Sequence, residues 1–284
     1  MMIETISKQG TAQWNEDALV VNDRLRLFGV LDGATSLHPY RGAGGETGGY
    51  LASRTIKNYL ESLREEDVAD ASLKHLVIQA NVRLREDMKE AGIDLTDKAS
   101  LWTSSLALIR VREHSIDYVQ AGDCMIAAKY EDGTVRTISR DQVDHIDQQS
   151  KKIWQDGIQS GITSREQLWS MVKPVIMQNK SKMNTLEGYS VLSGEPEAAE
   201  LLEYGTINRI RLRSLLLVTD GLFLPKEAGA EASDDCANLV AMVEKQTLAS
   251  YTDWLTRLEQ DDKECQKYPR FKISDDKTGI WIQF

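Results

Sequence analysis

Leu25–Gly33 reads Leu-Arg-Leu-Phe-Gly-Val-Leu-Asp-Gly, and this stretch decides the fold. A short apolar run that stands between polar neighbours and ends in a turn pair predicts a buried strand rather than a helix. A carboxylate at the tip of such a strand is unfavourable unless something compensates its charge. The stretch therefore predicts that a central strand delivers Asp32 to a polar site.

The same pattern returns twice further along the chain. Ser214–Gly221 is a second apolar run that ends in Asp-Gly, and Ile116–Asp123 is a weaker case in which the Gly comes first. Strand ends that offer several carboxylates to one place would form an oxygen-rich site, which hard divalent cations prefer. We therefore expect a metal site built from strand ends.

The remaining hydrophobic pattern predicts strands and helices in separate blocks. Strands are expected at Met2–Ser7, Ala18–Val21, Leu25–Leu31, Trp102–Val111, Ser115–Ala121, Met125–Tyr130, Thr134–Ile138, Ile207–Leu212, Leu215–Thr219 and Gly279–Phe284. One helix is expected to follow the glycine-rich loop at 34–49 and to end at about Leu63. Further helices are expected at Ser72–Ala91, Val143–Gln155, Arg165–Met177 and about 234–264. Strands that follow one another without helices favour antiparallel sheets. The pattern thus predicts an α+β fold with two antiparallel sheets and helices outside them.

The composition of the chain argues against several kinds of partner and metal site. The 284 residues carry a formal net charge of -10, which argues against a nucleic-acid partner. The three cysteines are far apart and indicate reduced thiols in a cytoplasmic protein. We find no signal-peptide pattern and no apolar run near the roughly 20 residues that span a bilayer, so no membrane partner is expected. With only four histidines, a zinc site of His and Cys is disfavoured.

Five acidic motifs stand out when the chain is taken in order. They are Glu16-Asp17, Asp32-Gly33, Gly122-Asp123, Asp220-Gly221 and Asp275-Asp276. Any one of them alone is typical of a turn or a helix cap, so a plain α+β domain with acidic turns is the simplest alternative. Five in this order, four of them beside predicted buried strands, indicate a common site.

This ordered set resembles the PP2C-type, metal-dependent serine/threonine protein phosphatase family over nearly the whole chain. The segments that carry the resemblance are Asn15–Ala18, Phe28–Gly33, Thr103–Ala107, Ala121–Asp123 with Tyr130–Gly133, Val218–Gly221 and Asp275–Thr278. The resemblance implies a four-layer αββα sandwich in which two central antiparallel sheets are flanked by helices. It implies one phosphatase domain over residues 1–284, with an insertion or flap at about 141–194.

The resemblance also implies a role for each acidic residue. Asp32 would bridge two Mg²⁺ or Mn²⁺ ions, and the carbonyl of Gly33 would bind one of them. Asp220 and Asp275 would hold the other ion, because Asp275, and not Asp276, falls three residues before Thr278 as in the family. Two further expectations complete the site: Asp123 contributes to a weaker third metal site, and metal-bound waters are held by Glu16 and Asp17.

The activity implied is hydrolysis of phosphoserine and phosphothreonine in proteins by attack of a metal-bridging hydroxide. In this mechanism Asp32 and Asp220 act through the activated water, the partner is a phosphorylated protein, and the phosphatase is expected to be a monomer. The choice between Mg²⁺ and Mn²⁺ stays open. Two alternatives also stay open: a non-catalytic PP2C-like regulator that binds a phosphorylated partner, and a hydrolase of a small phosphate ester.

Two departures from the family pattern bear on this choice. Many members carry a phosphate-binding Arg shortly before the Glu-Asp pair, whereas Gly10–Trp14 contains no basic residue here. Several members have His directly after Asp-Gly, where this chain has Ala34. Lys8 or Arg41 could substitute for the Arg, and the nearby His38 is interpreted as incidental. Both departures leave the predicted metal ligands unchanged. They put in question the rate of turnover and the binding of substrate.

Overall fold

The computed structural model describes residues 1–34, 36–68, 71–227 and 235–284. The strands are β1 (Met2–Lys8), β2 (Ala18–Asn22), β3 (Leu27–Ala34), β4 (Thr103–Val111), β5 (Ser115–Ala121), β6 (Met125–Tyr130), β7 (Val135–Thr137), β8 (Glu203–Asn208), β9 (Leu212–Val218) and β10 (Lys277–Gln283). The helices are α1 (Gly48–Ser62), α2 (Glu65–Val68), α3 (Leu73–Glu90), α4 (Asp144–Gln159), α5 (Arg165–Lys180), α6 (Ala198–Leu201), α7 (Asp235–Gln246) and α8 (Leu248–Asp261). Position 234, where the last helical region was expected to begin, lies outside the described residues.

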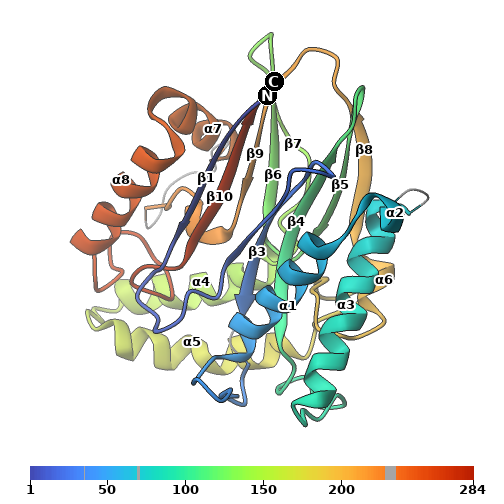
Figure 1. Cartoon of the computed structure of the whole chain (residues 1–284). Helices are drawn as coiled ribbons and strands as arrows, with labels where there is room; N and C mark the ends of the chain where they lie inside the picture. Colours follow the sequence, from blue (N-terminus) through green and yellow to red (C-terminus); the bar gives the residue numbers. More distant parts are fainter. Residues whose placement is uncertain (35, 69–70, 228–234) are drawn as a thin grey trace.

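Two antiparallel sheets of five strands form the centre of the molecule. One sheet has the order β1-β10-β9-β6-β7, and the other has the order β2-β3-β4-β5-β8. The first and last strands of the chain are neighbours, with Met2 opposite Gln283 and Lys8 opposite Lys277, so both termini lie at the same end of the sandwich (Figure 1). The last strand of the chain, β10, therefore joins β1 to the rest of its sheet.

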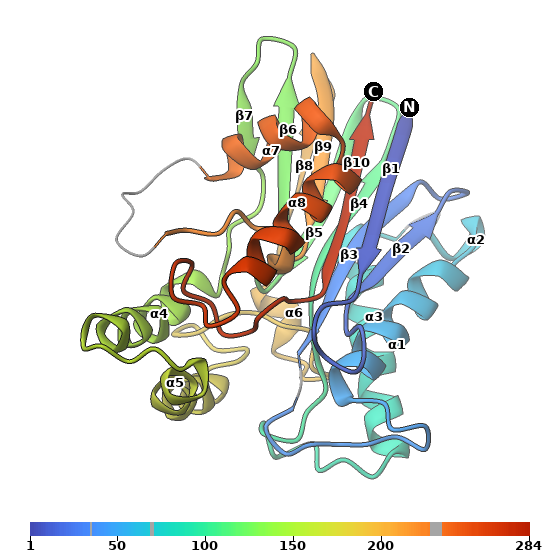
Figure 2. The same ribbon diagram turned by 90° about the vertical axis from the view of Figure 1, so that its left-hand side faces the viewer.

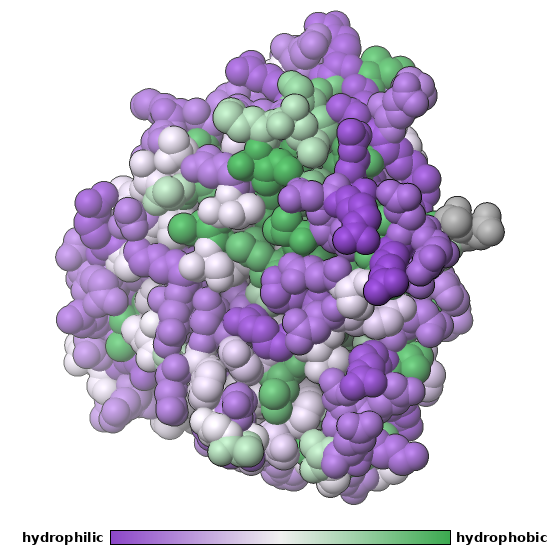
Figure 3. All heavy atoms as spheres, viewed as in Figure 1, coloured by the Kyte–Doolittle hydropathy of each residue, from purple (hydrophilic) through white to green (hydrophobic). Residues whose placement is uncertain are grey.

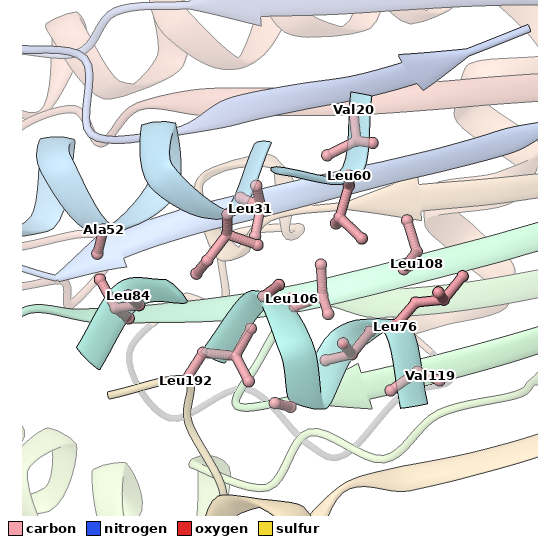
Figure 4. Close-up of a cluster of buried hydrophobic side chains, with 14 of the residues drawn as sticks. Val20, Leu31, Ala52, Leu60, Leu76, Leu84, Leu106, Leu108, Val119 and Leu192 are labelled. Atoms are coloured by element: carbon pink, nitrogen blue, oxygen red, sulfur yellow. The ribbon is translucent and has the colours of Figure 1, made fainter. Parts of the chain in front are cut away.

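Hydrophobic packing produces four layers, which Figure 2 shows. Helices α1 and α3 cover the outer face of the β2–β8 sheet, where Leu31, Leu60, Leu84 and Leu106 belong to one buried cluster (Figure 4). A second cluster fills the space between the sheets, and a third lies between the β1–β7 sheet and helices α7 and α8. The order helix–sheet–sheet–helix is the predicted αββα sandwich.

Helices α4 and α5 lie outside these layers, at the end of the sandwich opposite the chain termini (Figures 1 and 2). They have a small hydrophobic cluster of their own, in which Trp154 of α4 meets Leu168 and Val172 of α5. Cys265 and Phe271, from the segment between α8 and β10, complete this cluster. The helix pair is thus attached to the segment that leads to Asp275.

Several predicted strand boundaries differ from the observed ones, and two of these differences change the local structure. Strand β3 starts at Leu27 and continues to Ala34, so Asp32 and Gly33 still pair with Ser105 and Ser104 of β4 rather than following the strand. The predicted strand Ile207–Leu212 instead spans the turn between β8 and β9. Arg211 adopts a positive φ of 56° in that turn, and no glycine marks it.

Apolar side chains reach the surface between the two edge strands β1 and β2, as the green area near the centre of Figure 3 shows. Ile3 of β1 and Leu19 of β2 pack against the cluster between the sheets, and Met2 and Val21 are exposed. Within the described residues, we find no helix with both the length and the apolar character needed to cross a bilayer.

Candidate metal centre

The acidic motifs are brought together at the end of the sandwich that α4 and α5 cover. Asp32 comes from β3, Asp123 follows β5, Asp220 begins a short 3-10 helix after β9, and Asp275 precedes β10. Asp32 lies close enough to Asp220 for the two carboxylates to interact, and Asp32 also feels the charges of Asp17, Asp123 and Asp275. Both sheets therefore contribute carboxylates to one cluster.

The glycines after Asp32 and Asp220 are needed for close packing. A Cβ atom on Gly33 would lie 2.1 Å from the carbonyl oxygen of Gly49, and one on Gly221 would lie 1.8 Å from that of Asp276. Real Cβ atoms do not approach backbone oxygens so closely, because such contacts are deep in the repulsive range. The Asp-Gly pairs thus let the start of α1 approach the backbone at Gly33 and the segment before β10 approach the backbone at Gly221.

Glu16 and Asp17 are held rigidly beside this cluster. The Thr47 hydroxyl, at the start of α1, donates to Glu16 Oε1, and Gly33 N donates to the Glu16 carbonyl oxygen at 3.2 Å. The Thr219 hydroxyl donates to Asp17 Oδ2 at 2.8 Å. Arg54 of α1 donates to the Asp17 carbonyl oxygen at 2.5 Å. Each acidic side chain is thus held by a threonine hydroxyl, while Gly33 N and Arg54 hold the backbone of the two residues.

Asp276 has a structural task that differs from that of Asp275. Its two carboxylate oxygens accept from Gly10 N at 2.8 Å and from Glu16 N at 2.7 Å, so it fastens the segment between β1 and β2. Asp275 instead lies within the electrostatic reach of Asp17, Asp32 and Asp220. Asp276 is thus occupied by backbone amides, and Asp275 stays the predicted ligand.

The cluster is strongly repulsive in the absence of a cation. Burial is the main cause that raises the pKa of Asp32 and of Asp220 well above the usual value, and repulsion from neighbouring carboxylates adds to it. Burial and Asp275 raise the pKa of Asp17 in the same way. Burial and Asp141 raise the pKa of Asp123 to about 6. Like charges held together out of water require a compensating positive charge.

The residues present fit divalent ions. Asp123 Oδ1 and Asp220 Oδ1 are shielded from solvent and accept no hydrogen bond from any described residue. Buried oxygens are normally satisfied by a donor or an ion. Among the described residues, no three acidic, His or Cys side chains are close enough together to hold one ion unaided.

Several residues near the cluster had no clear signal in the sequence. Asp141 and Asp147, at the start of α4, act on Asp123, and burial raises the pKa of Asp147 to about 6. Lys180, at the end of α5, faces Glu16, and burial lowers its pKa to about 8. Lys272 Nζ lies 2.6 Å from Asp275 Oδ1. All four come from segments whose pattern predicted only helices and loops.

The basic residues considered as substitutes have other contacts. Lys8 Nζ binds Asp253 Oδ1 of α8 at 2.9 Å, and Arg41 donates to the carbonyl oxygen of Tyr40. His38 Nδ1 lies 2.9 Å from Asp97 Oδ2 on an exposed loop. These contacts agree with the interpretation of His38 as incidental.

A cavity of about 1020 Å³ opens beside the carboxylates. Asp123, Asp220 and Asp275 line one part of it, and apolar side chains such as Phe223 and Phe271 line another. Its remaining wall includes α4. A substrate that enters the cavity would therefore meet the carboxylate cluster and an apolar surface together.

We expect the metal-free protein to lose stability as pH rises from about 4 to 7. The pKa values of Asp123 and Asp147 are raised to about 6, and those of Asp17, Asp32 and Asp220 are also raised. In this window the folded state binds more protons than the unfolded chain, so the free energy of unfolding decreases with pH. Calorimetry in EDTA should give a higher melting temperature near pH 5 than near pH 8.

A neutral isostere provides the control for this pH effect. Asp220→Asn should reduce the difference between the two melting temperatures, because it removes one buried proton-binding group. Asp261→Asn removes the same charge from an exposed position at the end of α8 and should leave the difference unchanged. A metal-free protein that becomes more stable across this window would contradict the assignment.

Comparison with known proteins places the chain in a family. The sequence profile of the family described as Protein phosphatase 2C matches residues 7–265. No match was found among curated proteins.

Several solved structures share the fold. Serine/threonine phosphatase Stp1 from Staphylococcus aureus is 15% identical, with a TM-score of 0.58 over 99% of this chain and 94% of its own. The Mycobacterium tuberculosis serine/threonine phosphatase PstP/Ppp is 17% identical, with a TM-score of 0.57 over 100% and 98%. The catalytic domain of PstP in complex with two manganese ions is 18% identical, with a TM-score of 0.56 over 99% and 96%.

At these identities the likeness to solved structures establishes the αββα fold alone. The family profile covers most of the chain, including the first four acidic motifs. On this evidence, the chain belongs to the Protein phosphatase 2C family.

Proposed function

We propose that the protein is a Mg²⁺- or Mn²⁺-dependent phosphatase that removes phosphate from phosphoserine and phosphothreonine in other proteins. The observation that carries this proposal is the convergence of Asp32, Asp123, Asp220 and Asp275, in which two shielded oxygens have no donor among the described residues. Family membership supports the reaction class. The manganese ions in the PstP structure support the type of ion.

The proposed ligands come from different elements. Asp32 would contact both ions, the Gly33 carbonyl would bind one of them, and Asp220 and Asp275 would bind the other. Asp123 would take part in a third, weaker site beside Asp147. The ions, when bound, supply Lewis acidity and a nucleophilic water near neutral pH.

The chain's own residues would position the reactants. Thr47 and Thr219 orient the Glu16 and Asp17 carboxylates, which would hold bound water through hydrogen bonds. The segment 141–194, which carries α4 and α5, would act as a flap, because α4 lines the cavity beside the carboxylates. A phosphorylated side chain would enter that cavity.

Hydrolysis of p-nitrophenyl phosphate with Mn²⁺, with Mg²⁺ and with EDTA tests the proposal. We expect turnover that requires a divalent ion and disappears in Asp220→Ala. Phosphoserine and phosphothreonine peptides, compared with small phosphate esters, then establish the substrate class. Metal binding by calorimetry without any turnover would instead favour the non-catalytic regulator, to which the absence of a basic residue in Gly10–Trp14 and the presence of Ala34 point.

A further inference from the structure

Lys272 is a cationic side chain beside the candidate metal ligands. It lies in the segment between α8 and β10, and its Nζ donates to Asp275 Oδ1 at 2.6 Å. Its side chain is 52% exposed, and it lines the 1020 Å³ cavity together with Asp220 and Asp275. An ammonium group therefore borders the space that a substrate would enter.

Lys272 supplies a positive charge at the carboxylate cluster. A lysine carries an ammonium group at neutral pH, and here its Nζ contacts Asp275 and borders the cavity that Asp220 also lines. A phosphate monoester dianion is repelled by carboxylates, and an ammonium group beside them offsets part of that repulsion.

Three other cations near the cluster make contacts within the protein. Lys277 is buried and donates to Ser274 Oγ and to the Asp275 carbonyl oxygen, both at 2.9 Å. Lys180 is only 8% exposed and faces Glu16. Arg54 holds the backbone of the Glu16–Asp17 segment. Lys272 differs from these in being both exposed and adjacent to the candidate ligands.

The contact between Lys272 and Asp275 is exchangeable. A half-exposed ion pair contributes little to stability. An ion held by Asp275 would compete for the carboxylate and repel the ammonium group. The flexible four-carbon stem of lysine then allows Nζ to turn into the cavity that both residues line.

We propose that Lys272 binds the phosphoryl oxygens of the substrate and supplies the cationic contact that Gly10–Trp14 does not provide. This inference rests on the proposed phosphatase function. Lysine serves as a point-charge ligand of phosphate in many sites. In this role, the cationic contact to the phosphate comes from the segment before β10, near the C-terminal end of the sequence. The loop between β1 and β2, near the N-terminal end, does not supply it.

Binding of inorganic phosphate to the Mg²⁺-saturated protein tests this role without relying on turnover. Lys272→Met should raise the dissociation constant measured by calorimetry at least about tenfold, because it removes a charge-assisted hydrogen bond. Lys272→Arg should stay within about threefold of the wild type, since the positive charge is kept. Lys152→Met, in the same cavity wall on α4, should bind phosphate as the wild type does. The KM for p-nitrophenyl phosphate should rise in parallel with the dissociation constant.

Metal affinity distinguishes the proposed role from a purely local one. If Lys272 only neutralised Asp275, Lys272→Met would tighten Mg²⁺ binding and leave phosphate affinity at saturating Mg²⁺ unchanged, which would overturn the proposal. Absence of phosphate binding by the wild type would overturn it as well, whatever the turnover. Phosphate binding that depends on Lys272 in a protein without turnover would support the proposal and refute the phosphatase function. Equal melting temperatures of the variants would exclude misfolding as the cause.

Discussion

Replacing Asp32 by Asn is expected to abolish metal-dependent hydrolysis and to raise the melting temperature of the metal-free protein. Asp32 feels the charges of Asp220, Asp17, Asp123 and Asp275. An amide of the same shape keeps the packing, removes one buried negative charge and therefore relieves repulsion. The same change weakens ion binding, so kcat/KM should fall about 10³-fold or more.

The chain contains a matched control for this variant. Asp132-Gly133 is also an Asp-Gly pair, but it forms the exposed turn between β6 and β7, where Gly133 has a φ of 87°. Asp132→Asn creates another favourable hairpin turn and should change neither activity nor metal affinity. Both variants are compared by p-nitrophenyl phosphate turnover, by Mn²⁺ calorimetry and by melting in EDTA. If Asp32→Asn behaved like Asp132→Asn, Asp32-Gly33 would be only a turn, as in the plain α+β alternative.

Replacing Lys277 by Met is expected to cause the largest loss of stability among the substitutions considered. Lys277 is 1% exposed, and its Nζ lies 2.7 Å from Glu259 Oε2 of α8. Removing one partner of a buried ion pair leaves the other charge uncompensated, which lowers the free energy of unfolding by about 3–5 kcal/mol. Metal affinity should fall too, because Lys277 also holds the Asp275 carbonyl oxygen. Urea unfolding and Mn²⁺ calorimetry measure the two effects.

Two further variants separate charge burial from simple loss of a lysine. Lys267→Met breaks an exposed pair with Glu227 and should change stability by less than about 1 kcal/mol. Glu259→Gln combined with Lys277→Met should recover part of the loss, since the buried carboxylate is then neutral. A Lys277→Met protein as stable as Lys267→Met would show that the buried pair contributes nothing.

The sequence was sufficient to predict the layers and the place of the candidate site. Apolar runs that end in Asp-Gly predicted β3 and β9 with their carboxylates at one end, and the helical period predicted α1, α3, α7 and α8. These signals succeed because the spacing of apolar residues along a strand or a helix depends on which face of that element is buried. The predicted cluster of Asp32, Asp123, Asp220 and Asp275 follows from the same patterns.

Other features depend on contacts between distant segments and could not be predicted. The family spacing singled out Asp275 as the candidate ligand, but nothing in the sequence showed that Asp276 would accept hydrogen bonds from the backbone amides of Gly10 and Glu16. Lys272 and Lys277 resemble any surface lysines in sequence, yet one borders the cavity and the other is buried. The turn at Arg211 was missed because a positive φ at a non-glycine residue leaves no mark in the sequence.

The pairing of β1 with β10 has a consequence for synthesis of the chain. The ribosome releases β1 first, but its partner strand comes from residues 277–283, so the edge of β1 stays unpaired while more than 260 intervening residues are made. β10 also separates β1 from β9, so the β1–β7 sheet cannot be completed earlier. Contacts between such distant residues form slowly and leave strand edges open to aggregation in the meantime. The nascent chain would therefore gain the candidate ligand Asp275 and its protection from aggregation in the same late step.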